Sequence, residues 1–209
     1  MATAAADDRI VCYADYVCPF CYLGRTSLER YREEREEPLA VEWHPFDLRA
    51  GKRNADGSID HDADDGKDEA YYEQAKRNVR RLQEEYDVEM NRELAVEVDS
   101  LPAQLASFFV AREHPGTWLA FDAAIYEALW VDGRDIGDPD VLVDLAADVG
   151  LSESELRDRL EDDELRDRLE ERFDEARRTG ITGVPAFVFE GRLVSGAVPP
   201  EHLRRLVEQ

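Results

Sequence analysis

Apolar residues near the start of the chain follow first a strand pattern, then a helical pattern and then a strand pattern again. Alternation predicts one strand over residues 9–14 and another over residues 39–46. Between them, apolar residues recur at helical spacing from Pro19 to about Arg32, which predicts an amphipathic helix. A strand–helix–strand unit of this kind pairs its two strands in parallel, with a right-handed crossover.

A polar and acidic segment, residues 48–68, follows this unit and predicts a loop. Its acids fit an EF-hand register from Asp60 only in part, because Asp65 stands where glycine is needed and Tyr71 where glutamate is needed. We therefore expect a solvated loop rather than a calcium site. The chain then shows only helical periodicity, which predicts helices over 69–85, from about 102, over 117–130, over 139–149, from 153, and from about 165 to 180.

Strand character returns only near the C-terminus. Residues 184–189 are continuously apolar, as in a strand that is buried on both faces. Glu190 and Gly191 form a tight turn into residues 192–195, so these two segments are expected to pair as a hairpin. A last helix begins at Pro200. The pattern predicts an α/β fold whose strands come from the two ends of the chain.

Charge is the unusual feature of the composition. The chain has 49 acidic and 26 basic residues, a formal net charge of -23, and its only lysines are Lys52, Lys67 and Lys76. Such a surface repels phosphates and anionic lipids, so neither nucleic acid nor a membrane is an expected partner. Because the acids are spread over most of the chain, the bias resembles that of proteins from salt-loving organisms. No apolar run approaches the ~20 residues that span a bilayer, and the N-terminus lacks the features of a secretory signal, which predicts a cytoplasmic protein.

The motif Cys18-Pro19-Phe20-Cys21 stands directly after the first strand and opens the first helix. Unpaired N–H groups at a helix N-terminus stabilise an anion, so the Cys18 thiolate should form more easily than that of a free cysteine. Two intervening residues bring the sulfurs close enough to bridge. We therefore expect Cys18 to be the attacking thiol and Cys21 the resolving one, with Pro19 and Phe20 supporting them.

The same spacing also occurs as half of a zinc site. A complete site would need further ligands, and redox chemistry is favoured because the other candidates are scattered singly, so no metal is expected. Cys12 lies within the first strand and is interpreted as a buried, inert thiol. The scattered candidates are Cys12, His44, His61, His114 and His202.

Two distant segments carry a family resemblance. Residues 15–24, DYVCPFCYLG, and residues 180–188, GITGVPAFV, followed by SGAVP at 195–199, resemble the thioredoxin-fold DsbA family and most closely its FrnE-like branch. In that family the second motif holds a cis-proline that faces the redox pair. The resemblance implies that Val184 and Pro185 form this substrate-binding loop and pack against Cys18.

The resemblance also implies a domain organisation. It corresponds to a thioredoxin fold with a large all-helical insertion, with residues 1–66 and 165–209 in the thioredoxin-like domain and residues 67–164 in the insertion. The branch often has tryptophan at the position of Phe20 and glutamine at that of Val198, so substrate preference does not carry over.

The expected function is thiol–disulfide exchange on protein or small-molecule thiols and disulfides, with a redox partner that recycles the cysteine pair. No bound cofactor is expected, and glutathione or another low-molecular-weight thiol is the candidate co-substrate. Two alternatives stay open. One is a glutathione-dependent small-molecule isomerase or transferase, an activity of kappa-class glutathione transferases and 2-hydroxychromene-2-carboxylate isomerases, which share this fold but typically have serine as the nucleophile. The other is a non-catalytic binding module whose cysteines clamp zinc.

Overall fold

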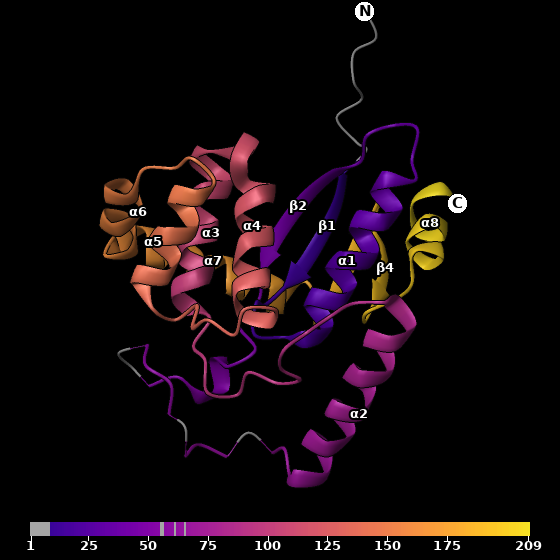
Figure 1. Cartoon of the computed structure of the whole chain (residues 1–209), viewed down its shortest axis with the longest axis horizontal. Coiled ribbons are helices and arrows are strands. Elements are labelled where there is room, and N and C mark those ends of the chain that lie inside the picture. Colours follow the sequence, from indigo (N-terminus) through magenta and orange to yellow (C-terminus); the bar gives the residue numbers. More distant parts are fainter. Residues whose placement is uncertain (1–8, 55–56, 61, 65) are drawn as a thin grey trace, which may run out of the picture.

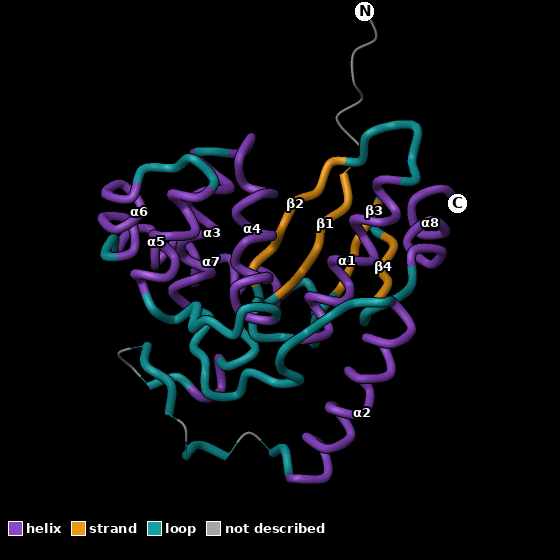
Figure 2. Tube along the Cα trace, viewed as in Figure 1, coloured by secondary structure: helices purple, strands orange, loops and turns teal. Residues whose placement is uncertain are grey.

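A four-stranded mixed sheet forms the centre of the molecule. The computed structural model describes residues 9–54, 57–60, 62–64 and 66–209. The strands lie in the order β2-β1-β3-β4 (Figure 2), with β1 parallel to β2 and antiparallel to β3, and β3 antiparallel to β4. The parallel unit and the C-terminal hairpin are therefore as predicted. Their bounds are Arg9–Ala14 for β1, Ala40–Pro45 for β2, Ala186–Phe189 for β3 and Arg192–Ser195 for β4.

Eight α-helices surround this sheet in the described part of the chain. In Figure 1, α3 to α6 gather on one side of the sheet, α8 lies beside α1, and α2 projects away from the other elements. The helices inserted between β2 and β3 confirm the predicted α/β architecture. Their bounds are Pro19–Glu33 (α1), Glu69–Tyr86 (α2), Leu101–Glu113 (α3), Pro115–Trp130 (α4), Pro139–Asp148 (α5), Glu153–Leu160 (α6), Asp163–Arg178 (α7) and Pro200–Glu208 (α8).

Alternation along β1 explains how both faces of the sheet are covered. Ile10 and Cys12 belong to the main hydrophobic core, which also contains residues of α1, α8 and the helices α3 to α6. Tyr13 points to the opposite face and packs with Ala176 of α7. Six aromatic residues of α3 and α4 are buried in the core: Phe108, Phe109, Trp118, Phe121, Tyr126 and Trp130.

The hairpin turn follows the chemistry of its two residues. Glu190 has φ 48° and Gly191 has φ 76°. Positive φ at both central positions matches the right-handed twist of the flanking strands, as in a type I′ turn. The turn therefore fixes the register between β3 and β4, in which Ala186 lies opposite Ser195.

Some sequence-based expectations need correction. β3 begins at Ala186 and not at Val184, because Pro185 has no N–H to add to the strand ladder. The acidic loop is not wholly irregular, since Ala50–Lys52 form a short 3-10 helix and Arg53 makes an isolated bridge with Ile59.

Several other expectations are not tested by this structure. The N-terminal segment 1–8, on which the absence of a secretory signal was judged, lies outside the described residues, and so does Asp65 of the tested calcium register. The division of the chain at residues 66/67 and 164/165 stays a prediction. Among the described helices, none combines the length and apolar character that a bilayer crossing requires.

Candidate active site

Cys18 is the N-cap residue of α1. Its backbone is extended, with φ -91° and ψ 113°, and Pro19 occupies the first turn of the helix. The N–H groups of Cys21 and Tyr22 donate to the Cys18 carbonyl at 3.0 and 3.3 Å. Proline is suited to the first turn because its missing N–H would have no helical partner there. The sequence therefore places Cys18 at the N-terminus of α1.

The segment after α7 brings a second wall to Cys18. The Cys18 thiol donates a hydrogen bond of 3.6 Å to the carbonyl oxygen of Val184. The peptide bond between Val184 and Pro185 is cis. Gly196 holds this segment from the other side, because its N–H donates to the Pro185 carbonyl at 2.8 Å. Two residues that are 166 positions apart in sequence thus lie in contact at one site.

Gly24 permits the close approach of α1 to the loop that carries Pro185. A Cβ atom there would lie 3.0 Å from Cγ of Pro185 and 3.2 Å from the ring of Phe187. Distances of this size are shorter than ordinary van der Waals contacts. Gly24 therefore lets α1 pack directly against the loop that carries Pro185.

The three cysteines differ in environment. Cys21 is 1% exposed. Burial raises the pKa of its thiol well above the ordinary value, and the hydrogen bond and charge of Cys18 raise it further. Burial, followed by the charge of Asp122, raises the pKa of Cys12 to about 12. Cys12 is therefore the buried, inert thiol that the sequence predicts, and the raised pKa of Cys21 favours its protonated form.

A buried carboxylate beneath the motif was missed by the sequence analysis. Asp15 is fully buried, and its two carboxylate oxygens accept hydrogen bonds from the N–H groups of Val17, at 3.3 Å, and Leu48, at 2.9 Å. Burial is the largest cause that raises the pKa of Asp15 to about 6, and the nearby charge of Asp47 adds to it. The position of Asp15 in the sequence could have indicated its burial, because this acid stands between an apolar strand and the cysteine motif.

Asp47 belongs to a cluster in which two carboxylates share one guanidinium. Its carboxylate pairs with the Arg53 guanidinium at 2.6 Å, and Arg53 pairs with Asp99 at 2.9 Å. Asp47 lies two residues after the end of β2, and Asp99 lies two residues before the start of α3. The pairs therefore tie the loop after β2 to the helical insertion.

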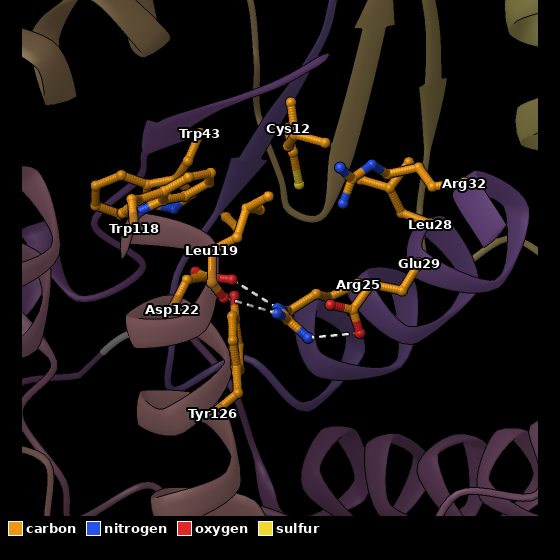
Figure 3. Close-up of a pocket in the computed structure, with 12 residues that line it drawn as sticks. Cys12, Arg25, Leu28, Glu29, Arg32, Trp43, Trp118, Leu119, Asp122 and Tyr126 are labelled. Atoms are coloured by element: carbon orange, nitrogen blue, oxygen red, sulfur yellow. Dashed lines mark hydrogen bonds and ion pairs between the residues drawn. The ribbon is translucent and has the colours of Figure 1, made fainter. Parts of the chain in front are cut away.

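A second buried network orients α1 (Figure 3). The Arg25 guanidinium pairs with Asp122 of α4 at 2.6 Å and with Glu29 at 2.8 Å. The hydroxyl of Tyr16 donates to the other carboxylate oxygen of Asp122 at 2.9 Å. Arg25, Glu29 and Asp122, together with Cys12, border a cavity of about 30 Å³, which has room for a water molecule but not for a substrate. The network is thus a structural link between α1 and the insertion.

A larger groove of about 540 Å³ opens beside Cys18. Cys18, Pro19 and Phe20 border it, and one wall is made by residues 46–52 of the loop after β2. The remaining walls come from the first half of α2, the segment 94–96 and the loop 182–184. All of the predicted site residues except the buried Cys21 and Pro185 line this groove.

One candidate metal ligand, His61, lies outside the described residues. Among the described residues, no group of three or more His, Cys, Asp or Glu side chains is placed to hold a metal ion. His44 has a structural environment instead. Its ring stacks on Tyr13 with centroids 4.5 Å apart, and its Nδ1 lies 3.1 Å from the Pro45 carbonyl oxygen.

Comparisons with known proteins agree with this architecture. A family model described as a DSBA-like thioredoxin domain matches residues 9–208. The uncharacterized protein YwbO of Bacillus subtilis (strain 168) is 28% identical over 190 residues, which cover 90% of each chain. A structure described as a probable DsbA oxidoreductase from Streptomyces coelicolor is 24% identical with a TM-score of 0.77, over 96% of this chain and 88% of that one. A 2-hydroxychromene-2-carboxylate isomerase structure is 16% identical with a TM-score of 0.72, over 96% and 93%. The matches confirm the predicted thioredoxin fold.

Proposed function

Because the chain belongs to the DSBA-like thioredoxin domain family, we propose that it is a thiol–disulfide oxidoreductase that works through Cys18 and Cys21. One observation carries the proposal. Cys18 stands at the N-terminus of α1 with its thiol against the Val184 carbonyl and on the border of an open groove. The closeness of a second cysteine, Cys21, and of an open groove supports roles for Cys18 as the attacking thiol and for Cys21 as the resolving thiol.

The exchange proceeds in two steps. The Cys18 thiolate attacks one sulfur of a substrate disulfide, which forms a Cys18–substrate S–S bond and releases the other substrate sulfur as a thiolate. Cys21 then loses its proton to the released thiolate and attacks the Cys18 sulfur, which frees the second substrate thiol. Two electrons pass from the cysteine pair to the substrate, and the Cys18–Cys21 disulfide is left. The reverse sequence oxidises a substrate dithiol.

A polypeptide is the substrate that the groove suits best. Large apolar side chains are exposed at Leu48, Tyr71 and Val96, at 37%, 52% and 53%, and all three line the groove. Clustered exposed apolar groups beside a reactive atom are typical of a binding surface. The substrate cysteine would reach Cys18 between Phe20 and the loop that holds Val184, whose backbone would contact the extended chain.

The pair must be recycled after each turnover. We propose a second thiol or disulfide as the partner, with glutathione or another low-molecular-weight thiol as the candidate and no bound cofactor. The proposed location is the cytoplasm, because three cysteines, of which Cys12 is buried alone within β1, do not make up the disulfide framework typical of secreted domains.

Three variants test the proposal. With insulin as the disulfide substrate, Cys18→Ser should abolish turnover, because no other described thiol faces the groove. Cys21→Ser should accumulate a mixed disulfide at Cys18, measured as a mass increase that dithiothreitol removes. Cys12→Ala is the matched control and should keep the parent rate. Turnover that survives Cys18→Ser, or a Cys21→Ser protein that never traps substrate, would refute the assignment.

The same variants separate the alternative activity. A glutathione-dependent isomerase or transferase needs one nucleophile and no resolving thiol. Turnover of a small-molecule substrate that persists in Cys21→Ser and requires glutathione would favour that alternative. Loss of activity in both single variants favours disulfide exchange.

A further inference from the structure

The groove beside Cys18 reverses the charge balance of the chain. Among the described residues that line it, Arg49, Lys52 and Lys67 are basic and only Asp47 is acidic. The carboxylate of Asp47 is already paired with Arg53. Over the whole chain the balance is opposite, with 49 acidic and 26 basic residues. Two of the three lysines of the protein therefore lie at the place where substrate must bind.

Arg49 supplies a charge that no acid offsets. Its guanidinium donates to the backbone carbonyl oxygens of Ala95 and Val96, which hold the side chain against the opposite wall of the groove. In the described part of the chain, no carboxylate forms an ion pair with it. Carbonyl oxygens fix the position of a guanidinium without cancelling its charge. Arg49 is thus held in place and still able to attract an anion.

Lys67 places a second charge next to an apolar surface. Its ammonium group lies 5.7 Å from the centre of the Tyr71 ring, and that ring is half exposed in the groove. A cation is attracted to the face of an aromatic ring. Apolar contact and positive charge are therefore offered together, which suits a polypeptide that carries both apolar and acidic side chains.

We infer that the groove selects polypeptide segments in which carboxylates flank the reactive cysteine, an inference that rests on the proposed function. The remainder of the surface, at a net charge of -23, repels such segments. Basic side chains at the point of contact offset this repulsion locally, because a salt solution screens charges beyond about 10 Å at 0.1 M. The groove therefore favours acidic segments over neutral ones, and neutral ones over basic ones.

Synthetic peptides test the selectivity. Three peptides of equal length each contain one leucine and one central cysteine, which is joined by a disulfide to a chromophoric thiol. The peptides differ only in the residues that flank the cysteine, which are glutamate in the first, glutamine in the second and lysine in the third. The fully reduced protein reacts with each in a single turnover, and the release of chromophore gives the second-order rate constant. The same constant with dithiothreitol, which is uncharged, corrects for the intrinsic reactivity of each peptide.

The glutamate peptide should react about fivefold faster than the glutamine peptide after this correction, as expected for a few partly screened charge contacts. The advantage should shrink as salt rises from about 0.05 M to about 0.5 M. Arg49→Gln should reduce the ratio of the two rate constants, and Arg49→Lys should restore it, because lysine keeps the charge. Arg205→Gln, on the exposed side of α8, makes the same change in net charge and should leave the ratio as it is.

Two outcomes would overturn the inference in different ways. Equal corrected rate constants for the glutamate and glutamine peptides would refute charge selection and leave disulfide exchange standing. Absence of any reaction with all three peptides would refute the proposed function and the inference with it. A ratio that changes equally in Arg49→Gln and Arg205→Gln would assign the preference to net charge and not to the groove.

Discussion

Titration of the buried Asp15 should make the protein lose stability as the pH rises from acid to neutral. The carboxylate is inaccessible to solvent, and its hydrogen bonds join Val17, directly before the motif, to Leu48 in the groove wall. Its pKa is raised from 3.8 to about 6, first by burial and then by the charge of Asp47. The folded state therefore holds this proton more tightly than the unfolded chain does.

The sign and size follow from proton linkage. Between pH 3.8 and about 6 the unfolded chain has released the proton and the folded protein has kept it, so the free energy of unfolding falls as the pH rises. One pKa unit corresponds to 1.36 kcal/mol, so a shift of about two units corresponds to about 3 kcal/mol over the full range. The unfavourable contribution is complete above about pH 6 and absent below the unfolded pKa.

Asp15→Asn isolates this contribution. The amide cannot accept from both N–H groups, so a pH-independent loss of about 1–3 kcal/mol is expected. On top of this loss, the stability of the parent relative to the variant should fall by about 2–3 kcal/mol from about pH 4 to about pH 7.5. Urea unfolding at several pH values measures both, because other carboxylates cancel in the difference.

Asp148→Asn, at an exposed position of α5, changes the formal charge equally and serves as the control. Its difference from the parent should show no comparable trend with pH. If the difference for Asp15→Asn were flat across the same range, or rose with pH, the buried carboxylate would not be titrating as the structure implies.

Two further substitutions test how α1 is held. Gly24→Ala should cost about 1–3 kcal/mol of stability and slow disulfide exchange, because the new Cβ would lie 3.0 Å from Pro185, whereas Gly116→Ala, which has open space, should cost nothing in denaturant unfolding. Arg25→Met should cost about 3–5 kcal/mol, because it leaves the buried carboxylate of Asp122 without its cation. Adding Asp122→Asn to Arg25→Met should recover part of that loss, and a double variant less stable than Arg25→Met alone would contradict the ion-pair account.

Local patterns predict the elements of the fold because the chemistry that forms them is local. The turn at Glu190 and Gly191 specifies its own geometry, and the period of two along β1 already separates its two buried faces. Cys18 is recognised for the same reason, since a strand, a cysteine, a proline and a helix follow one another directly. The partnership with Val184 came from resemblance, because no local pattern joins residues 166 positions apart.

Buried charge could not be predicted in the same way. Asp15 and Asp122 look like ordinary surface acids in the sequence, and their burial depends on what other segments place over them. Asp15 interacts with the loop after β2 and with Ser100, the N-cap residue of α3. Asp122 is contacted by Arg25 of α1 and by Tyr16, which precedes the cysteine motif. Each accepts a hydrogen bond from a donor that is far away in the chain, Leu48 for Asp15 and Arg25 for Asp122.

The charge of the groove shows why net charge is a poor guide to a binding site. A net charge of -23 argues against anionic partners when the molecule is viewed from a distance. Close to Cys18 the field is set by side chains within about 8–10 Å, the screening length at ordinary ionic strength. Lys52 and Lys67 belong to an acidic loop of the sequence, yet both line the groove in the folded protein. Arg49 lines it as well and donates hydrogen bonds to the backbone carbonyl oxygens of Ala95 and Val96. The net charge argues against nucleic acid as a partner, because its many phosphates would meet the whole acidic surface. It does not argue against a short acidic segment that contacts only this groove.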